Sequence, residues 1–167
     1  MQPTKKTMTE EAALRELSAL CAKGEHCRHD LLEKMRRWQL TEEAQTRILA
    51  RLAGERYVDD ARYARAFVSD KIRYNKWGRR KVEQALWQKH IDKDIVEEVL
   101  GEVPDEEYIS ILRPLLKQRQ KALPAKGAPT GGATESARLI RFALSRGFTM
   151  DVIRQCIDVE DEDEFLD

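Results

Sequence analysis

The stretch RKVEQALWQKHI at residues 80–91 is followed by DIVEEVL at residues 94–100. Two further copies of this pattern lie in the chain: LIRFALSRGF at 139–148 with DVIRQCI at 151–157, and a fainter LLEKMRRWQL at 31–40 with EAQTRIL at 43–49. Aligning the copies places Leu31, Val82 and Leu139 in register, with shifts of 51 and 57 residues. Self-similarity at such a period is typical of a repeat protein, whose units cannot bury their apolar faces alone.

The composition is that of a water-soluble helical chain. Charged residues make up 36% of the 167 residues, aromatic residues 7%, and no apolar run approaches the roughly 20 residues that a membrane span needs. The amino terminus lacks the apolar core of a signal peptide. Three cysteines without framework spacing fit a reducing compartment. We therefore expect a cytoplasmic protein without membrane contact.

Each copy predicts a repeat of three helices. No alternation of period two with β-branched residues occurs, so the expected fold class is all-α, an array of three tandem three-helix repeats. The predicted boundaries are 9–57 for the first repeat, 58–103 for the second and 104–158 for the third, which carries a mobile Gly/Pro-rich loop at about 122–135; an acidic tail follows at 159–167.

The helices of the middle repeat are predicted from their caps and breakers. The first begins after Asp59 or Asp60, since both carboxylates can accept the free N–H groups of a helix start, and runs to about Tyr74. The second and third helices cover about 80–89 and 93–100. In the third repeat, Pro114 lies inside the expected first helix, 105–123, where proline removes a hydrogen bond and usually produces a kink.

The formal net charge of zero hides a segregation of charge. Residues 62–93 hold ten Lys or Arg and three acids, and residues 113–146 hold eight basic residues and one acid. Residues 158–167 hold seven acids and no base. A basic middle indicates a polyanionic partner, and the tail either folds back on the basic face or only aids solubility.

The first helix of the middle repeat is predicted to have two faces. At about 100° per residue, one face carries Tyr63, Ala64, Phe67 and Val68, and the opposite face carries Arg62, Arg65, Ser69 and Arg73, with Lys76 beyond. An isolated basic face is more often merely solvated. Because Arg138, Arg141 and Ser145 form a comparable line in the third repeat, binding of a polyanion is favoured.

The tryptophans allow two interpretations. Trp87 lies off the apolar stripe of its helix, so it is either packed against a neighbouring repeat, which is commoner, or a platform for a base or a protein partner. Trp38 is expected in the core, and Trp77, in a turn, fits either role.

Catalytic and metal-binding chemistry find little support. Cys21, His26, Cys27 and His29 lack the paired spacing of a zinc site, and a partly buried turn between helices explains them better. No nucleophile elbow or phosphate-binding glycine loop is present. We expect no metal, no cofactor and no catalytic residue.

One family resemblance covers about residues 10–157. The stretch YVDDARYARAFV at 57–68, followed by GRRKVEQALWQKHI at 78–91, resembles the RecX family of bacterial recombinase regulators, and the Arg-Gly-Phe of residues 146–148 resembles its C-terminal element. The chain departs from the family pattern at His90, where a glycine usually precedes the isoleucine, at Pro114 and in the long Gly/Pro loop.

The resemblance implies an elongated, curved array of three repeats that is not an enzyme. It implies a protein that binds the RecA–DNA filament and mainly inhibits the ATPase and recombinase activities of RecA in DNA repair and recombination. The implied partners are RecA and single- or double-stranded DNA, contacted directly or through RecA, and we expect a monomer. The candidate contact residues are Arg62, Arg65, Arg73, Lys76, Arg79, Arg80, Arg138, Arg141 and Arg146.

Two alternative functions remain open at this point. A stand-alone nucleic-acid-binding protein predicts tight binding to bare DNA with a steep salt dependence. A helical-repeat adaptor for another protein predicts binding that survives high salt and depends on apolar side chains such as Trp87.

Overall fold

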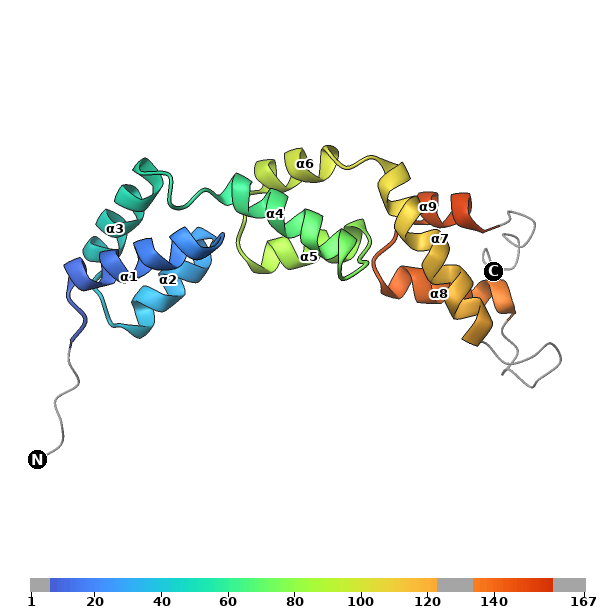
Figure 1. Cartoon of the computed structure of the whole chain (residues 1–167), viewed down its shortest axis with the longest axis horizontal. Helices are drawn as coiled ribbons and strands as arrows, with labels where there is room; N and C mark the ends of the chain where they lie inside the picture. Colours follow the sequence, from blue (N-terminus) through green and yellow to red (C-terminus); the bar gives the residue numbers. More distant parts are fainter. Residues whose placement is uncertain (1–6, 123–133, 158–167) are drawn as a thin grey trace, which may run out of the picture. The chain divides into compact units, whose positions relative to one another are not determined.

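The computed structural model describes residues 7–122 and 134–157, and within these ranges all regular structure is helical. The predicted all-α fold of three-helix repeats is therefore confirmed. The helices labelled in Figure 1 are α1 (Glu10–Lys23), α2 (Arg28–Arg37), α3 (Glu42–Gly54), α4 (Asp60–Arg73), α5 (Arg79–Gln88), α6 (Lys93–Gly101), α7 (Asp105–Ala122), α8 (Glu135–Ser145) and α9 (Met150–Cys156).

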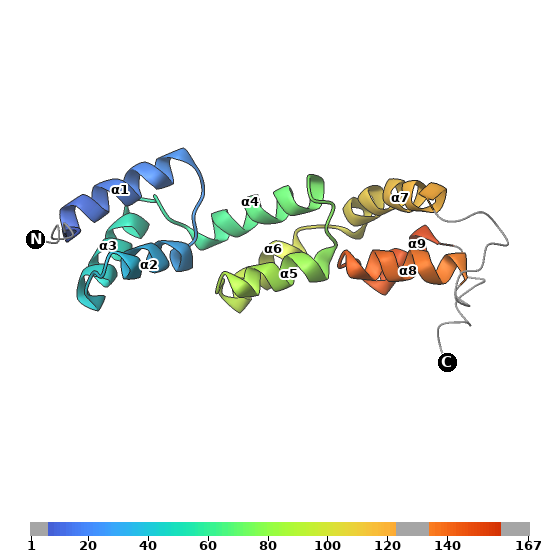
Figure 2. The ribbon, with the colours of Figure 1, turned by 90° about the horizontal axis from the view of Figure 1, so that it is seen from below.

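The chain divides into two compact units. The first holds described residues up to 67 together with 86–96, and the second holds 68–85 together with the described residues from 97 onward. In the first unit α1 and α2 both pack on α3; in the second, α7 packs on α8 and α9, as Figure 2 shows. Each unit therefore combines one complete helix triplet with part of the middle repeat.

The second helix of every triplet ends in the same turn. The N–H groups of Leu40, Ile91 and Phe148 each donate to a carbonyl five residues earlier, at 3.1, 3.3 and 3.1 Å. The preceding residue is left-handed in all three turns, with φ of 59° at Gln39, 55° at His90 and 93° at Gly147. This is a Schellman motif, and it recurs at shifts of 51 and 57 residues, as in the sequence alignment.

The departure at His90 leaves that turn intact. A left-handed conformation costs a non-glycine residue about 1–2 kcal/mol, which glycine avoids. The His90 ring stacks on the His29 ring with centroids 4.1 Å apart and planes inclined by 10°. Lys89, the residue before His90, donates to the Asp30 carboxylate at 3.0 Å. Side chains therefore hold the turn against α2.

Helix caps recur with the same spacing. Thr41 and Thr149 accept hydrogen bonds from the N–H groups of Ala44 and Val152 at the starts of α3 and α9. Asp92, at the matching position before α6, accepts one from the Asp94 N–H. Short polar side chains thus begin the third helix of each triplet by satisfying N–H groups that the helix leaves unpaired.

The two predicted acidic caps of α4 have separate roles. Asp59 accepts the Arg62 N–H of its own helix at 3.1 Å. Asp60 instead accepts the Arg28 N–H at the start of α2, at 2.9 Å. Burial raises the pKa of Asp60, and the hydrogen bond from Arg28 opposes this shift. The second carboxylate therefore joins two repeats instead of capping its own helix.

Buried apolar side chains line each triplet. In the first unit, the fully buried side chains include Leu17, Leu31, Met35 and Leu52, and Ile48 is nearly so. Trp38 packs against this core as expected. The aligned residues Val82 and Leu139 are also buried. The apolar stripe read from the sequence is therefore the buried face in every repeat.

The remaining predictions on the chain's organisation fall partly outside the described residues. Helix α7 includes Pro114, so this proline does not end the helix. The expected Gly/Pro loop falls mainly on residues 123–133, and the acidic tail falls on 158–167, which lie outside the described residues.

Tyr108 carries a buried hydroxyl that we expect to be destabilising. Its side chain is 2% exposed, the hydroxyl has no hydrogen-bond partner among the described residues, and burial raises its pKa to about 12. Because an unsatisfied buried hydroxyl costs about 1–3 kcal/mol, Tyr108→Phe should raise the free energy of unfolding by about 1 kcal/mol in urea denaturation. The control is Tyr63→Phe. Because the Tyr63 hydroxyl has a partner in the Cys27 thiol, its removal should bring no gain in the free energy of unfolding. A loss of stability in Tyr108→Phe would contradict this account.

Candidate polyanion-binding surface

Helix α4 has the two faces expected from its sequence. Tyr63, Ala64 and Val68 are buried, whereas Arg65 and Arg73 are exposed. The Tyr63 and Phe67 rings contact each other with centroids 5.8 Å apart. Packing of the apolar face thus leaves the opposite face of α4 available for basic side chains.

The Arg62 side chain is bound by other groups of the first compact unit. Its guanidinium pairs with the Glu25 carboxylate and also donates to the backbone carbonyls of Arg56 and Tyr57, at 3.0 and 3.3 Å. These bonds join the loop before α2 to the start of α4. These contacts give Arg62 a structural role, and its expected contact with a partner stays a prediction.

The second unit holds a dense basic segment at the end of α4 and the start of α5. Arg73, Lys76 and Arg80 are exposed, and Arg79 is half-buried. Arg73 lies 3.9 Å from Glu107, a weak contact between exposed groups. The pairing therefore does little to neutralise the segment.

Two glycines bring Arg146 to this basic segment. The Gly78 N–H donates to the Arg146 carbonyl at 2.8 Å, and the Arg80 N–H donates to the Gly147 carbonyl at 2.9 Å. A Cβ on Gly78 would overlap the Phe148 backbone, and one on Gly147 would lie 2.5 Å from Lys81. The N-terminus of α5 is thus capped by the turn between α8 and α9, more than 60 residues away in sequence.

The basic residues of α8 differ in their surroundings. Arg141 is exposed and Arg138 half-buried. The guanidinium of Arg146 lies 5.4 Å from the Phe142 ring centroid, and that of Arg119, from α7, lies 5.0 Å from it. Arg119, which was not among the predicted contact residues, therefore adds to the positive charge beside α8.

The aromatic side chains near this surface were the least predictable. Tyr74 is 79% exposed at the end of α4, although nothing in the sequence singled it out. Trp77 is half-buried, with the ammonium groups of Lys71 and Lys81 at 5.0 and 4.8 Å from its ring centroid. Trp87 is 45% exposed, so the expectation that it is buried against a neighbouring repeat is wrong. The sequence signal that could have identified Tyr74 is its place between Arg73 and Lys76, in a basic segment that ends a helix.

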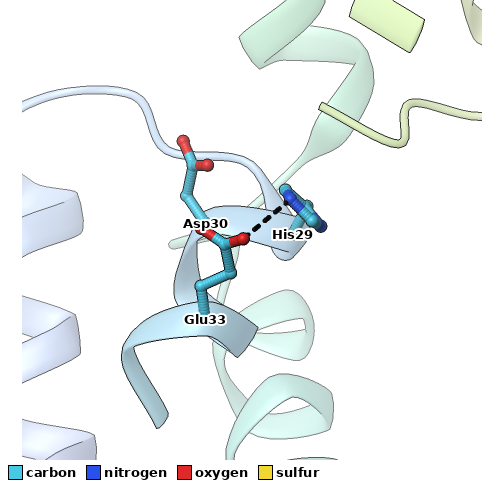
Figure 3. Close-up of side chains that lie close together, drawn as sticks. All are labelled: His29, Asp30 and Glu33. Atoms are coloured by element: carbon cyan, nitrogen blue, oxygen red, sulfur yellow. Dashed lines mark ion pairs between the residues drawn. The ribbon is translucent and has the colours of Figure 1, made fainter. Parts of the chain in front are cut away.

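Among the described residues, the suspected zinc ligands Cys21, His26, Cys27 and His29 do not form a cluster with metal-ligand spacing. Cys27 is fully buried at the start of α2, and burial raises the pKa of its thiol to about 11, which disfavours the thiolate that binds metal. The one described group with metal-ligand spacing is His29, Asp30 and Glu33. Figure 3 shows the Glu33 carboxylate turned toward His29, at 3.3 Å, and the Asp30 carboxylate turned away. Since Asp30 also pairs with Lys89, ion pairs account for this cluster.

Comparisons with known proteins agree with this arrangement. Residues 59–100 match the family model described as RecX, second three-helix domain, and residues 112–157 match RecX, third three-helix domain. The regulatory protein RecX of Chromobacterium violaceum is 30% identical over 148 residues, covering 89% of this chain and 90% of the relative. The chain belongs to the RecX family.

Further similarities extend over most of the chain. The regulatory protein RecX of Halorhodospira halophila is 30% identical over 154 residues, or 92% of this chain and 89% of the relative. The crystal structure of RecX from Lactobacillus salivarius has a TM-score of 0.76 at 17% identity, over 88% of this chain and 93% of that chain, which shows a shared fold. In the described ranges, no helix combines the length and apolar character that a bilayer crossing requires.

Proposed function

We propose that this protein binds the filament that the RecA recombinase forms on DNA and restrains its ATPase and recombinase activities. Membership in a family whose relatives are named regulatory proteins carries the proposal. In this role the protein acts by binding and needs no catalytic residue of its own.

The distribution of charge supports a polyanionic partner. Arg73, Lys76, Arg80 and Arg141 are exposed within one compact unit. A RecA–DNA filament presents DNA phosphates together with acidic protein surface, and exposed cations attract both. The electrostatic part of such binding weakens as salt rises.

The proposal is tested by the DNA-dependent ATPase of RecA on single-stranded DNA, with this protein titrated from substoichiometric to equimolar ratios. We expect ATPase to fall at amounts too low to coat the DNA. Inhibition only when the DNA is coated would favour a stand-alone nucleic-acid-binding protein. No inhibition at any ratio would contradict regulation of RecA and favour an adaptor for another protein.

Charge reversal tests the assigned surface. The triple variant Arg73→Glu, Arg80→Glu and Arg141→Glu should need roughly tenfold more protein for half-inhibition, because three exposed cations become repulsive. The matched control reverses Arg15, Lys23 and Arg37, three exposed residues of the first compact unit, and should inhibit like the unchanged protein. Thermal unfolding of both variants checks that the fold is retained. Equal effects of the two triples would place the interaction elsewhere.

A further inference from the structure

The loop between α4 and α5, residues 74–78, presents an aromatic ring in a strongly basic setting. Tyr74 is 79% exposed, the largest exposed fraction among the exposed large hydrophobic side chains of the described residues. The loop is closed by a hydrogen bond from the Trp77 N–H to the Lys71 carbonyl at 3.0 Å, and Lys76 takes a left-handed φ of 58°. The backbone therefore holds the loop in a defined conformation.

The cations around this loop are gathered by aromatic and backbone contacts. The Lys71 and Lys81 ammonium groups lie 5.0 and 4.8 Å from the Trp77 ring centroid, which attracts cations through its π electrons. The segment from Lys71 to Lys81 contains no acid, and its basic residues are Lys71, Arg73, Lys76, Arg79, Arg80 and Lys81. Positive charge is thus concentrated around the Trp77 ring, in the same short segment of chain as the exposed Tyr74.

The third repeat also places residues beside this loop, including a basic one. The hydrogen bond from the Gly78 N–H to the Arg146 carbonyl places the backbone of Arg146 next to the loop, and the Arg146 guanidinium lies over the Phe142 ring of α8. Gly147 contacts Lys81 so closely that a Cβ would lie 2.5 Å from the Lys81 Cβ and backbone nitrogen. The basic setting is therefore built from two repeats within the second compact unit.

We propose that Tyr74 and the lysines of the same segment, residues 71–81, form a site for single-stranded DNA. The Tyr74 ring stacks on an unpaired base, and the ammonium groups of Lys76 and Lys81 neutralise neighbouring phosphates. This deepens the proposed function, because it names one component of the filament that the protein contacts directly.

The chemistry favours an unpaired nucleic acid over other anionic partners. The cores of protein–protein interfaces are depleted of charged residues, whereas Tyr74 lies in a segment, residues 71–81, that holds six basic residues and no acid. Bases in a duplex are stacked on each other and are not free to stack on a side chain. Stacking on Tyr74 therefore predicts preference for single strands, while the lysines alone bind single and double strands.

The test is fluorescence anisotropy with a labelled oligothymidine of about 20 nucleotides, in the absence of RecA. This oligonucleotide is longer than the roughly 4–16 nucleotides that a stacking platform covers. Tyr74→Ala should weaken single-strand binding by about five- to a hundredfold, and Tyr74→Phe should retain it. Binding to a duplex of the same length should change less than about twofold in Tyr74→Ala, since no base stacks there. Because Tyr74 is exposed, the fold should persist, which circular dichroism checks.

Leu144→Ala is the control, since it removes another exposed large hydrophobic side chain of the second compact unit, outside the loop, and should leave single-strand binding unchanged. Unchanged single-strand binding in Tyr74→Ala overturns the proposal, as does an equal loss in Leu144→Ala or on the duplex. Stronger binding to anionic phospholipid vesicles than to DNA, lost in Tyr74→Ala, overturns it in favour of a membrane partner. Since RecA is absent, each of these results is independent of the ATPase experiment.

Discussion

Replacing Gly78 by alanine should lower the free energy of unfolding by about 3 kcal/mol. The added Cβ would overlap the backbone of Gly147 and Phe148, far inside the 3.0 Å that real Cβ contacts respect. The turn between α8 and α9 must then move away, and the N–H groups of Gly78 and Arg80 lose their carbonyl partners. Each buried N–H left unpaired costs about 1–3 kcal/mol. Thermal unfolding should show a fall in Tm of roughly 6–12 °C.

Gly101→Ala is the matched control for this substitution. Gly101 is the last residue of α6, and a Cβ there meets nothing within 4 Å. Because alanine is a better helix former than glycine, this variant should be unchanged or more stable by up to about 1 kcal/mol. A Tm of Gly78→Ala equal to that of Gly101→Ala would mean that α5 and the α8–α9 turn do not approach this closely.

Leu31→Ala should lower the free energy of unfolding by about 2–5 kcal/mol. Leu31 is fully buried in α2, in a core that includes Leu17, Met35 and Leu52. Truncation removes buried apolar surface and leaves a cavity that the surrounding helices fill only in part. Denaturation in urea measures the loss.

Leu144→Ala provides the comparison, since Leu144 is 39% exposed on α8 and loses much less buried surface. Its effect should stay below about 1 kcal/mol. If both leucine variants lost equal stability, then Leu31 would not lie in the core and the alignment of Leu31 with Val82 and Leu139 would be wrong.

The aligned positions explain why the fold class was predictable. Apolar residues at helical spacing, a polar cap before the third helix, and a left-handed residue after the second helix are local features, each set within a few residues. The turns at Gln39, His90 and Gly147 recur at the shifts read from the sequence, although only one of the three residues is glycine. The histidine was a departure from the family pattern, yet local hydrogen bonding gave the same turn.

The candidate surface was predictable only in its overall charge. Arg62 and Arg73 occupy the same face of α4 at the helical spacing of about 100° per residue. In the structure, however, Arg62 pairs with Glu25, whereas Arg73 is exposed. Asp60 lies in α4, yet it accepts a hydrogen bond at the start of α2. A partner from another helix cannot be read from periodicity, since its position depends on how the helices pack.

The sequence by itself determined the repeat, the helix ends, the buried stripe and the segregation of charge, because each depends on neighbouring residues. Tertiary structure alone decided that Gly78 meets Gly147, that the lysines flank Trp77, and that Tyr74 and Trp87 are exposed. These features depend on contacts between segments as much as 69 residues apart, Gly78 and Gly147 among them, and on which side chains such contacts leave in solvent. Their physical origin is the packing of whole helices, which leaves no local pattern in the chain.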